Sequence, residues 1–152
     1  MSRVLPDSWP LPSLDKHTRP FFTSGKIVIQ SCDQCNRVQH PPEDICYGCQ
    51  SSEFAFIEHR PIGTVYSHTE ITHAIHPLLE DVVPYSVVLI SLEDAPELRI
   101  IGNIVNLHPD QIRIGMKVEA VWEKIRTEES EDVFLLPQWH VTNDTSDDTH
   151  RS

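Results

Sequence analysis

All four cysteines of this chain lie in two CxxC pairs that are separated by ten residues, Cys32-Asp33-Gln34-Cys35 and Cys46-Tyr47-Gly48-Cys49. One CxxC turn can place two thiolates on one side of a metal ion, and a second turn can complete a tetrahedron. Thiolates suit zinc or iron, and four of them leave no coordination position open for a substrate. We therefore predict a structural metal site with zinc as the metal, and rubredoxin-type iron as the alternative. Its ligands are Cys32, Cys35, Cys46 and Cys49.

Disulfides or redox chemistry are the other uses of such pairs. Disulfides belong to oxidising compartments. Residues 1–14 contain three prolines and no apolar run long enough for a signal peptide, and no stretch of about 18 apolar residues occurs. We therefore expect a cytoplasmic protein with reduced thiols. A thioredoxin-like motif is a single CxxC where a strand opens a helix, whereas both pairs here are surrounded by turn residues.

The 152 residues suit one compact domain or a small domain with a metal module. Thr18 and Gly25 are suited to begin and end a short helix, whose Phe21 and Phe22 would dock on an apolar surface. The strands Lys26–Gln30 and Phe54–Ile57 enclose the cysteines as in a zinc ribbon. We divide the chain into an N-terminal helical and irregular segment (1–25), the ribbon (26–60), a β domain (61–141) and a disordered tail (142–152).

The β domain contains five runs that are rich in β-branched and aromatic residues. A helical turn at Pro109–Ile112 separates the third run from the fourth, and Gly102 inside the third run indicates a bulge or tight bend. This pattern predicts a five-stranded OB-fold barrel, with a β-sandwich as the alternative. The fold class is therefore mainly β. The five runs are Gly63–Ile71, Tyr85–Leu92, Leu98–Val105, Lys117–Ile125 and Val133–Val141.

The order of these motifs resembles the zinc-ribbon/OB-fold family of acyl-CoA-associated proteins. The resemblance rests on the short helix, the two CxxC pairs, and the runs Gly63–Ser67, Pro84–Ile90 and Ile112–Val118, and it extends over about residues 18–141. Asn36 and Gln50 follow the CxxC pairs where the family favours glycine. Members of this family are non-catalytic partners of thiolase-like enzymes, including aldolases of steroid side-chain degradation, or of acyl-CoA hydratases.

The resemblance implies an accessory subunit that binds a CoA thioester and leaves the chemistry to a thiolase-like partner, in a hetero-oligomer. The basic residues nearest to the cysteines are Lys26, Arg37 and Arg60, and we predict that they contact CoA. A subunit of an acyl-CoA hydratase, or a structural adaptor that does not touch CoA, are the alternatives. We expect no catalytic residues in the isolated chain.

The residues alone also permit a nucleic-acid-binding protein or a free-standing enzyme. Nucleic-acid binding needs a basic footprint, whereas this chain has a formal net charge of −11 and scattered cations. An enzyme could use His68, His73 and His76, but the cysteines are engaged as ligands and no Gly-rich phosphate loop is present. The same histidines, with Glu70, could form a second metal site, although a polar strand end is the simpler interpretation.

The aromatic residues and two loops of the β domain have expected places in the core or on the surface. We assign Trp122, Phe134 and Trp139 to the core or to subunit contacts, and favour core packing over a ligand groove for Tyr66 and Tyr85. The loops His73–Pro84 and Arg126–Asp132 correspond to those that take ligands in OB folds. The first loop should expose Ile75, Leu78, Leu79 and Val82 to a partner or an acyl chain, and strand Phe134–Val141 is the second expected contact surface.

Overall fold

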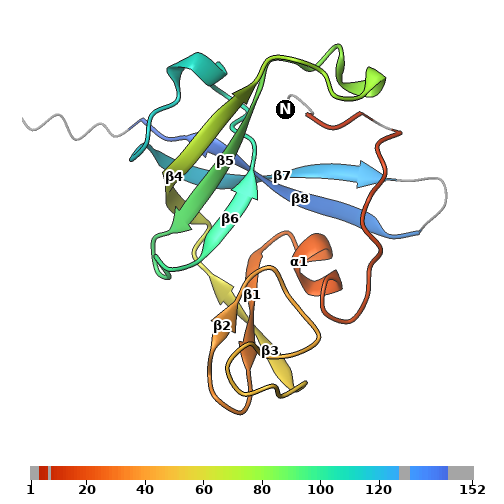
Figure 1. Ribbon diagram of the computed structural model, residues 1–152, viewed down its shortest axis with the longest axis vertical. Helices are drawn as coiled ribbons and strands as arrows, with labels where there is room; N and C mark the ends of the chain where they lie inside the picture. Colours follow the sequence, from red (N-terminus) through yellow and green to blue (C-terminus); the bar gives the residue numbers. More distant parts are fainter. Residues whose placement is uncertain (1–3, 7, 127–130, 144–152) are drawn as a thin grey trace, which may run out of the picture.

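The computed structural model describes residues 4–6, 8–126 and 131–143, and two antiparallel sheets form its framework (Figure 1). Most of the predicted tail and part of the loop Arg126–Asp132 lie outside these residues. No helix within the described ranges is both long and apolar enough to cross a bilayer. The elements, in chain order, are α1 (Arg19–Thr23), β1 (Ile27–Cys32), β2 (Val38–Gln39), β3 (Phe54–His59), β4 (Ile62–Ile71), η1 (Pro77–Leu79), β5 (Tyr85–Leu92), β6 (Arg99–Gly102), η2 (Pro109–Gln111), β7 (Lys117–Arg126) and β8 (Val133–Val141).

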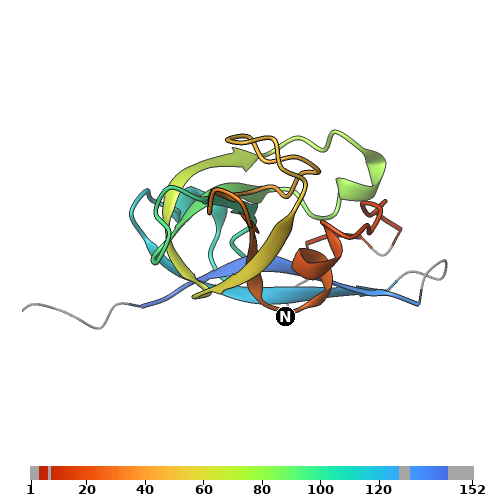
Figure 2. The ribbon, with the colours of Figure 1, turned by 90° about the horizontal axis from the view of Figure 1, so that it is seen from below.

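The smaller sheet has the order β2-β1-β3 and forms the ribbon, in which β1 pairs with β3 from Ile27–His59 to Cys32–Phe54. The larger sheet has the order β6-β5-β4-β7-β8. It curves until its two edge strands meet, and a parallel bridge joins Ile104 to Trp139. Figure 2 shows β7 and β8 along one side of this barrel. The predicted ribbon and five-stranded barrel are therefore confirmed.

One hydrophobic core runs through both sheets. Strand β1 contributes Ile27 and Ile29, and α1 contributes Phe21, to the same cluster as the barrel residues Val88, Ile90 and Trp139. Phe21 is 5% exposed, and α1 lies between the ribbon and β8 (Figure 1). The predicted docking of this helix is confirmed, and the shared core fixes the ribbon against the barrel.

Gly102 ends the third barrel strand earlier than the sequence predicts. A Cβ at this position would lie 2.9 Å from two indole atoms of Trp139, so only glycine lets β6 approach the fully buried tryptophan. Beyond Gly102 the backbone no longer pairs with β5 and bonds to β8 instead. Trp139 N–H donates to Asn103 O (2.9 Å), and Val105 N–H donates to Trp139 O (3.0 Å). The strand therefore ends at Gly102 and not at Val105.

Pro137 sits in the middle of β8 without interrupting the ladder with β7. Adjacent residues of a strand direct their N–H groups to opposite edges, and Trp139 directs its own toward Asn103. Pro137 lies two residues before Trp139, so its nitrogen faces the same edge, away from the β7 ladder. The missing N–H of proline therefore costs no bond to β7, and pairing runs unbroken from Val118–Val141 to Arg126–Val133.

Candidate metal centre

Two knuckles with the same backbone pattern carry the four cysteines. In the first, Cys32 N–H donates to Arg37 O (2.9 Å) and Asn36 N–H donates to Cys32 O (2.9 Å). The second knuckle repeats this pattern with Cys46 bonded to Ser51 O (2.8 Å) and to Gln50 N–H (3.0 Å). Asn36 and Gln50 have φ angles of 57° and 63°, so these two non-glycine residues adopt the left-handed conformation that the knuckle requires.

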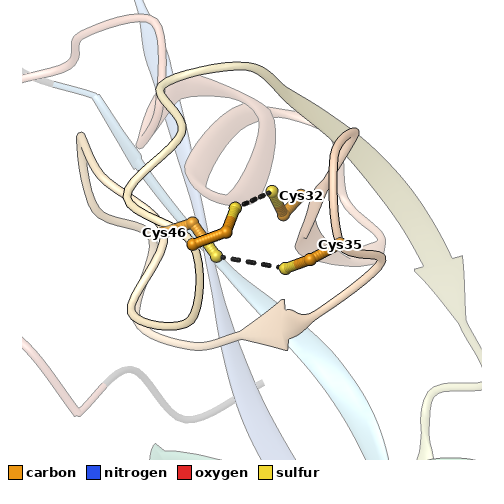
Figure 3. Close-up of side chains that lie close together, drawn as sticks. Cys32, Cys35 and Cys46 are labelled. Atoms are coloured by element: carbon orange, nitrogen blue, oxygen red, sulfur yellow. Dashed lines mark hydrogen bonds between the residues drawn. The ribbon is translucent and has the colours of Figure 1, made fainter.

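The four sulfur atoms converge on one point between the knuckles and all lie within 4.8 Å of one another. Figure 3 shows Cys32 and Cys35 facing Cys46 across the site. Cys32 Sγ is 3.5 Å from Cys49 Sγ, and Cys35 Sγ is 3.5 Å from Cys46 Sγ. A disulfide would need about 2.05 Å, whereas ligands about 2.3 Å from one zinc lie about 3.8 Å apart. The site therefore suits a tetrahedral ion, as predicted.

The backbone helps to ionise the ligands. The N–H groups of Cys49 and Gly48 point at the Cys46 sulfur and lower the pKa of Cys46 to about 6, against burial, which opposes this shift. The Gly48 nitrogen lies 3.3 Å from that sulfur. A thiolate is the form that binds metal, so these donors favour the ligand state of Cys46. At Cys49 the Ser51 N–H acts in the same direction, but the facing sulfurs, Cys32 first, outweigh it and raise the pKa of Cys49 to about 12. Because all four positions of the tetrahedron are protein thiolates, such an ion would hold structure and activate no water.

A buried amide network holds the loop that leads into the second knuckle. Gln30 and Gln39 are 1% and 3% exposed. The Gln30 side chain pairs with the backbone of Glu43 through both amide atoms, at 2.7 and 3.0 Å, as a neighbouring strand would. Gln39 donates to Gln30 Oε1 (2.8 Å) and accepts from Tyr47 N–H (3.2 Å). The loop is therefore fixed by side-chain amides in place of a ladder.

His17 connects the N-terminal segment to this network. Its Nδ1 lies 3.2 Å from Gln30 Nε2, and its Nε2 lies 3.0 Å from Asp44 Oδ1, close enough for an ion pair although not aligned for a hydrogen bond. The sequence did not reveal the roles of Gln30, Gln39 and His17. The available signal was a glutamine that interrupts the apolar strand Ile27–Cys32.

The predicted CoA-binding cations do not converge. Lys26 pairs with Glu58 (2.9 Å) and Arg60 with Glu93 (3.0 Å), both at the end of the ribbon that joins the barrel. Arg37 lies in the first knuckle, where its stem packs beside Gly48. The strand between these positions spans about 17 Å for five residue steps. The structure thus places Lys26 and Arg60 at the same end of the ribbon, each paired with its own carboxylate, and Arg37 at the other end. Their contact with CoA stays a prediction.

The histidines do not assemble a second metal site in the part of the chain that the structure describes. The four cysteines are the only group there of three or more His, Cys, Asp or Glu side chains with ligand atoms close enough to share an ion. His76 instead accepts from Leu78 N–H and packs its ring edge-to-face on Trp9, with ring centroids 5.5 Å apart.

Two surface predictions need correction. Tyr66 is 53% exposed and not in the core, because it alternates with the buried Gly63 and Val65 along β4 and therefore points outward. Leu79 is 4% exposed, since η1 turns it inward, while Ile75 and Leu78 remain on the surface. Phe134 and Trp139 of β8 lie in the interior, while five of its nine residues are partly exposed, so its contact with a partner stays a prediction.

Comparison with known proteins agrees with this architecture. Residues 23–55 match the family described as the ChsH2 rubredoxin-like zinc ribbon domain, and residues 58–123 match the ChsH2 C-terminal OB-fold domain. A DUF35 domain-containing scaffold protein of Methanocaldococcus jannaschii is 34% identical over 71% of this chain and 75% of its own length. A probable enoyl-CoA hydratase alpha subunit of Thermomonospora curvata is 34% identical over 85% of this chain, which spans only 41% of that subunit.

Solved structures show the same arrangement. The chain superposes on one chain of a structure described as the Ltp2-ChsH2(DUF35) aldolase with a TM-score of 0.71 and 30% identity, covering 86% of this chain and 98% of that one. A DUF35 protein from Sulfolobus solfataricus, at 16% identity and a TM-score of 0.50, shares the fold. The paired knuckles, the shared core and these matches together show that the chain belongs to the DUF35 family of zinc-ribbon/OB-fold proteins, to which the ChsH2 domains belong.

Proposed function

We propose that this chain is a non-catalytic accessory subunit of a thiolase-like enzyme, an aldolase or thiolase that acts on CoA thioesters of lipid or steroid side chains. One observation carries the proposal. The structure that it matches over 98% of a chain, at 30% identity, is described as an aldolase made of Ltp2 and a ChsH2 DUF35 chain. Relatives described as scaffold proteins support the same role.

The chemistry of the metal centre supports an accessory role. Its four thiolates fill a tetrahedron, so the proposed zinc has no position left to polarise a substrate. The centre joins the knuckles near the end of β1, and β1 in turn shares its core with the barrel. The proposed zinc would therefore hold the two knuckles in a fixed position relative to the barrel. Remote binding contacts can raise the rate at a reacting carbonyl elsewhere by positioning a long CoA thioester, without adding a catalytic group.

A hydratase subunit is the second candidate, because the Thermomonospora relative is described as a probable enoyl-CoA hydratase alpha subunit. Co-production separates the two candidates. We expect the tagged chain to form a stable complex, measured by size-exclusion chromatography with light scattering, with the thiolase-like aldolase subunit of its own organism. Copurification with the hydratase subunit alone would favour the second candidate, and a chain that binds neither enzyme would contradict both.

Calorimetric titration with CoA and acetyl-CoA addresses the ligand separately. We expect heat of binding from the complex, and a loss of affinity when Lys26 and Arg60 are both replaced by Gln. A complex that forms normally but in which these replacements leave CoA affinity unchanged would assign the chain the role of a structural adaptor.

A further inference from the structure

The outer face of strands β4, β5 and β6 carries a cluster of apolar side chains although it lies on the surface of the barrel. In β5 every second residue is buried, and the alternate residues point outward. Cross-strand partners share a face, so the outward Leu89 lies between Ser67 of β4 and Ile101 of β6. We call this surface the β4–β5–β6 outer face. Its apolar members are Tyr66, Ile71, Tyr85, Val87, Leu89 and Ile101.

The composition of this face differs from that of the rest of the surface. Ile101 is 61% exposed and Tyr66 is 53% exposed, while the outward positions of β4 carry hydroxyl groups such as Thr69. The exposed positions of neighbouring β7 are charged, with Lys117, Glu119, Lys124 and Arg126. In a chain with 23 acidic residues, a solvated sheet face would carry such charges. The outward positions of β4, β5 and β6 carry only one such charge, Arg99, which indicates a surface that is covered in the working protein.

Arg99 is the one charged residue among the outward positions of the ladder. Its guanidinium carbon lies 3.9 Å from the centroid of the Tyr66 ring, and the group donates to Ser91 Oγ and to the carbonyl oxygens of Pro96 and Leu98. No carboxylate among the described residues forms an ion pair with it. A tyrosine and an arginine held together in an apolar surround are the residue types that dominate binding energy at protein interfaces.

The charge of this face indicates which kind of molecule can bind to it. Nucleic acid and anionic membranes need several cations, whereas this face offers one in a chain of net charge −11. A second copy packed by two-fold symmetry would present the same face, which has no carboxylate to meet Arg99, and would bury two cations unpaired. A different protein with an apolar surface and a suitably placed carboxylate satisfies both the apolar residues and Arg99.

We propose that the β4–β5–β6 outer face is the docking surface for the partner enzyme subunit, which places an apolar patch on Leu89 and Ile101 and a carboxylate opposite Arg99. This inference rests on the proposed function, because it assigns a surface to that partner.

The test measures the equilibrium dissociation constant between the full-length chain and the purified thiolase-like aldolase subunit of the same organism. We expect Ile101→Glu and Arg99→Glu each to weaken the complex by at least about tenfold. Thr69→Glu repeats the test at an exposed hydroxyl position, where a carboxylate perturbs the fold little. The matched control is Ile45→Glu, since Ile45 is 54% exposed in the ribbon, and it should change the constant by less than about twofold. Zinc content and melting temperature verify the fold of each variant.

The outcomes separate the two proposals. If the wild-type chain binds and the three variants of the face bind equally well, the docking surface is wrong and the accessory role stands. If Ile45→Glu weakens the complex as much as Ile101→Glu, the assignment to this face is also overturned. If the wild-type chain does not bind the enzyme subunit, both proposals fail. If the chain alone is a dimer that Ile101→Glu converts to a monomer, the occupant is a second copy and the inference is overturned.

Discussion

Replacing His40 should remove a distinct part of the pH dependence of stability. His40 lies between the ribbon and α1, with its ring centroid 4.8 Å from that of Phe21. Burial in this apolar contact lowers the pKa of His40 from 6.5 to about 4. The unfolded chain therefore binds a proton more tightly than the folded chain. The contribution of the neutral ring to stability is complete above pH 6.5 and is lost as the pH falls from 6.5 toward 4.

The size of this effect follows from the two pKa values. A difference of about 2.5 units corresponds to about 3.4 kcal/mol below pH 4, and about 2 kcal/mol of it is lost by pH 5. Carboxyl groups also titrate toward the lower end of this range, so the informative quantity is a difference between proteins. The variants His40→Leu and His40→Gln remove the ionisable ring and keep every other group.

The assay is urea unfolding of the zinc-loaded protein and of both variants at pH 7.5 and pH 5.0. We expect the free energy of unfolding of the wild type to fall by about 2 kcal/mol more than that of either variant between these values. Proton NMR of the His40 ring gives its pKa in the folded state directly. Equal pH dependence in the three proteins, or a folded-state pKa above 6, would refute the reasoning.

Three other predictions follow from the metal centre, the barrel closure and the charge. The purified chain should hold about one zinc, and Cys46→Ser should lose both the metal and the ribbon, because structural zinc contributes roughly 10–16 kcal/mol of apparent folding free energy in small modules. Elemental analysis that finds iron, or a circular dichroism spectrum in which the ribbon of the variant survives, would contradict this prediction. Gly102→Ala should destabilise the fold by about 1–3 kcal/mol in urea, since its methyl group would meet the buried Trp139 at 2.9 Å; unchanged unfolding would show that the indole can move. At roughly physiological salt the chain should not bind single-stranded DNA or RNA, as a gel shift would report; a micromolar, salt-sensitive complex would contradict the accessory role.

The metal site and the positions of the strands along the chain could be predicted from the sequence because both have local signals. The CxxC spacing fixes which sulfurs can meet, and β-branched and aromatic residues mark strands such as Tyr85–Leu92 and Val133–Val141, whose observed bounds agree with the prediction. Asn36 and Gln50, which stand where the family favours glycine, do adopt the positive φ that the knuckles need.

The features that escaped prediction depend on tertiary contacts. Leu79 reads as part of an exposed apolar loop, and only the turn at η1 directs it inward. Tyr66 points outward because it alternates with Val65, and only the packing of β4 shows that Val65 is on the buried side. The Gln30 and Gln39 network joins residues that are distant in sequence and has no spacing that could reveal it. The same limit applies to the outer face, because apolar residues on a β-strand do not show by themselves which side is covered.

Activity on a CoA thioester tests the central claim most directly. The substrate is an acyl-CoA of the partner's pathway, and turnover is measured for the isolated chain, the isolated thiolase-like aldolase subunit and their complex at equal concentrations. The account predicts no turnover by the chain alone, and a higher rate for the complex than for the enzyme subunit alone, because the chain positions the substrate without adding a catalytic group. Turnover by the isolated chain, or an enzyme subunit that is fully active and equally stable without it, would contradict the account.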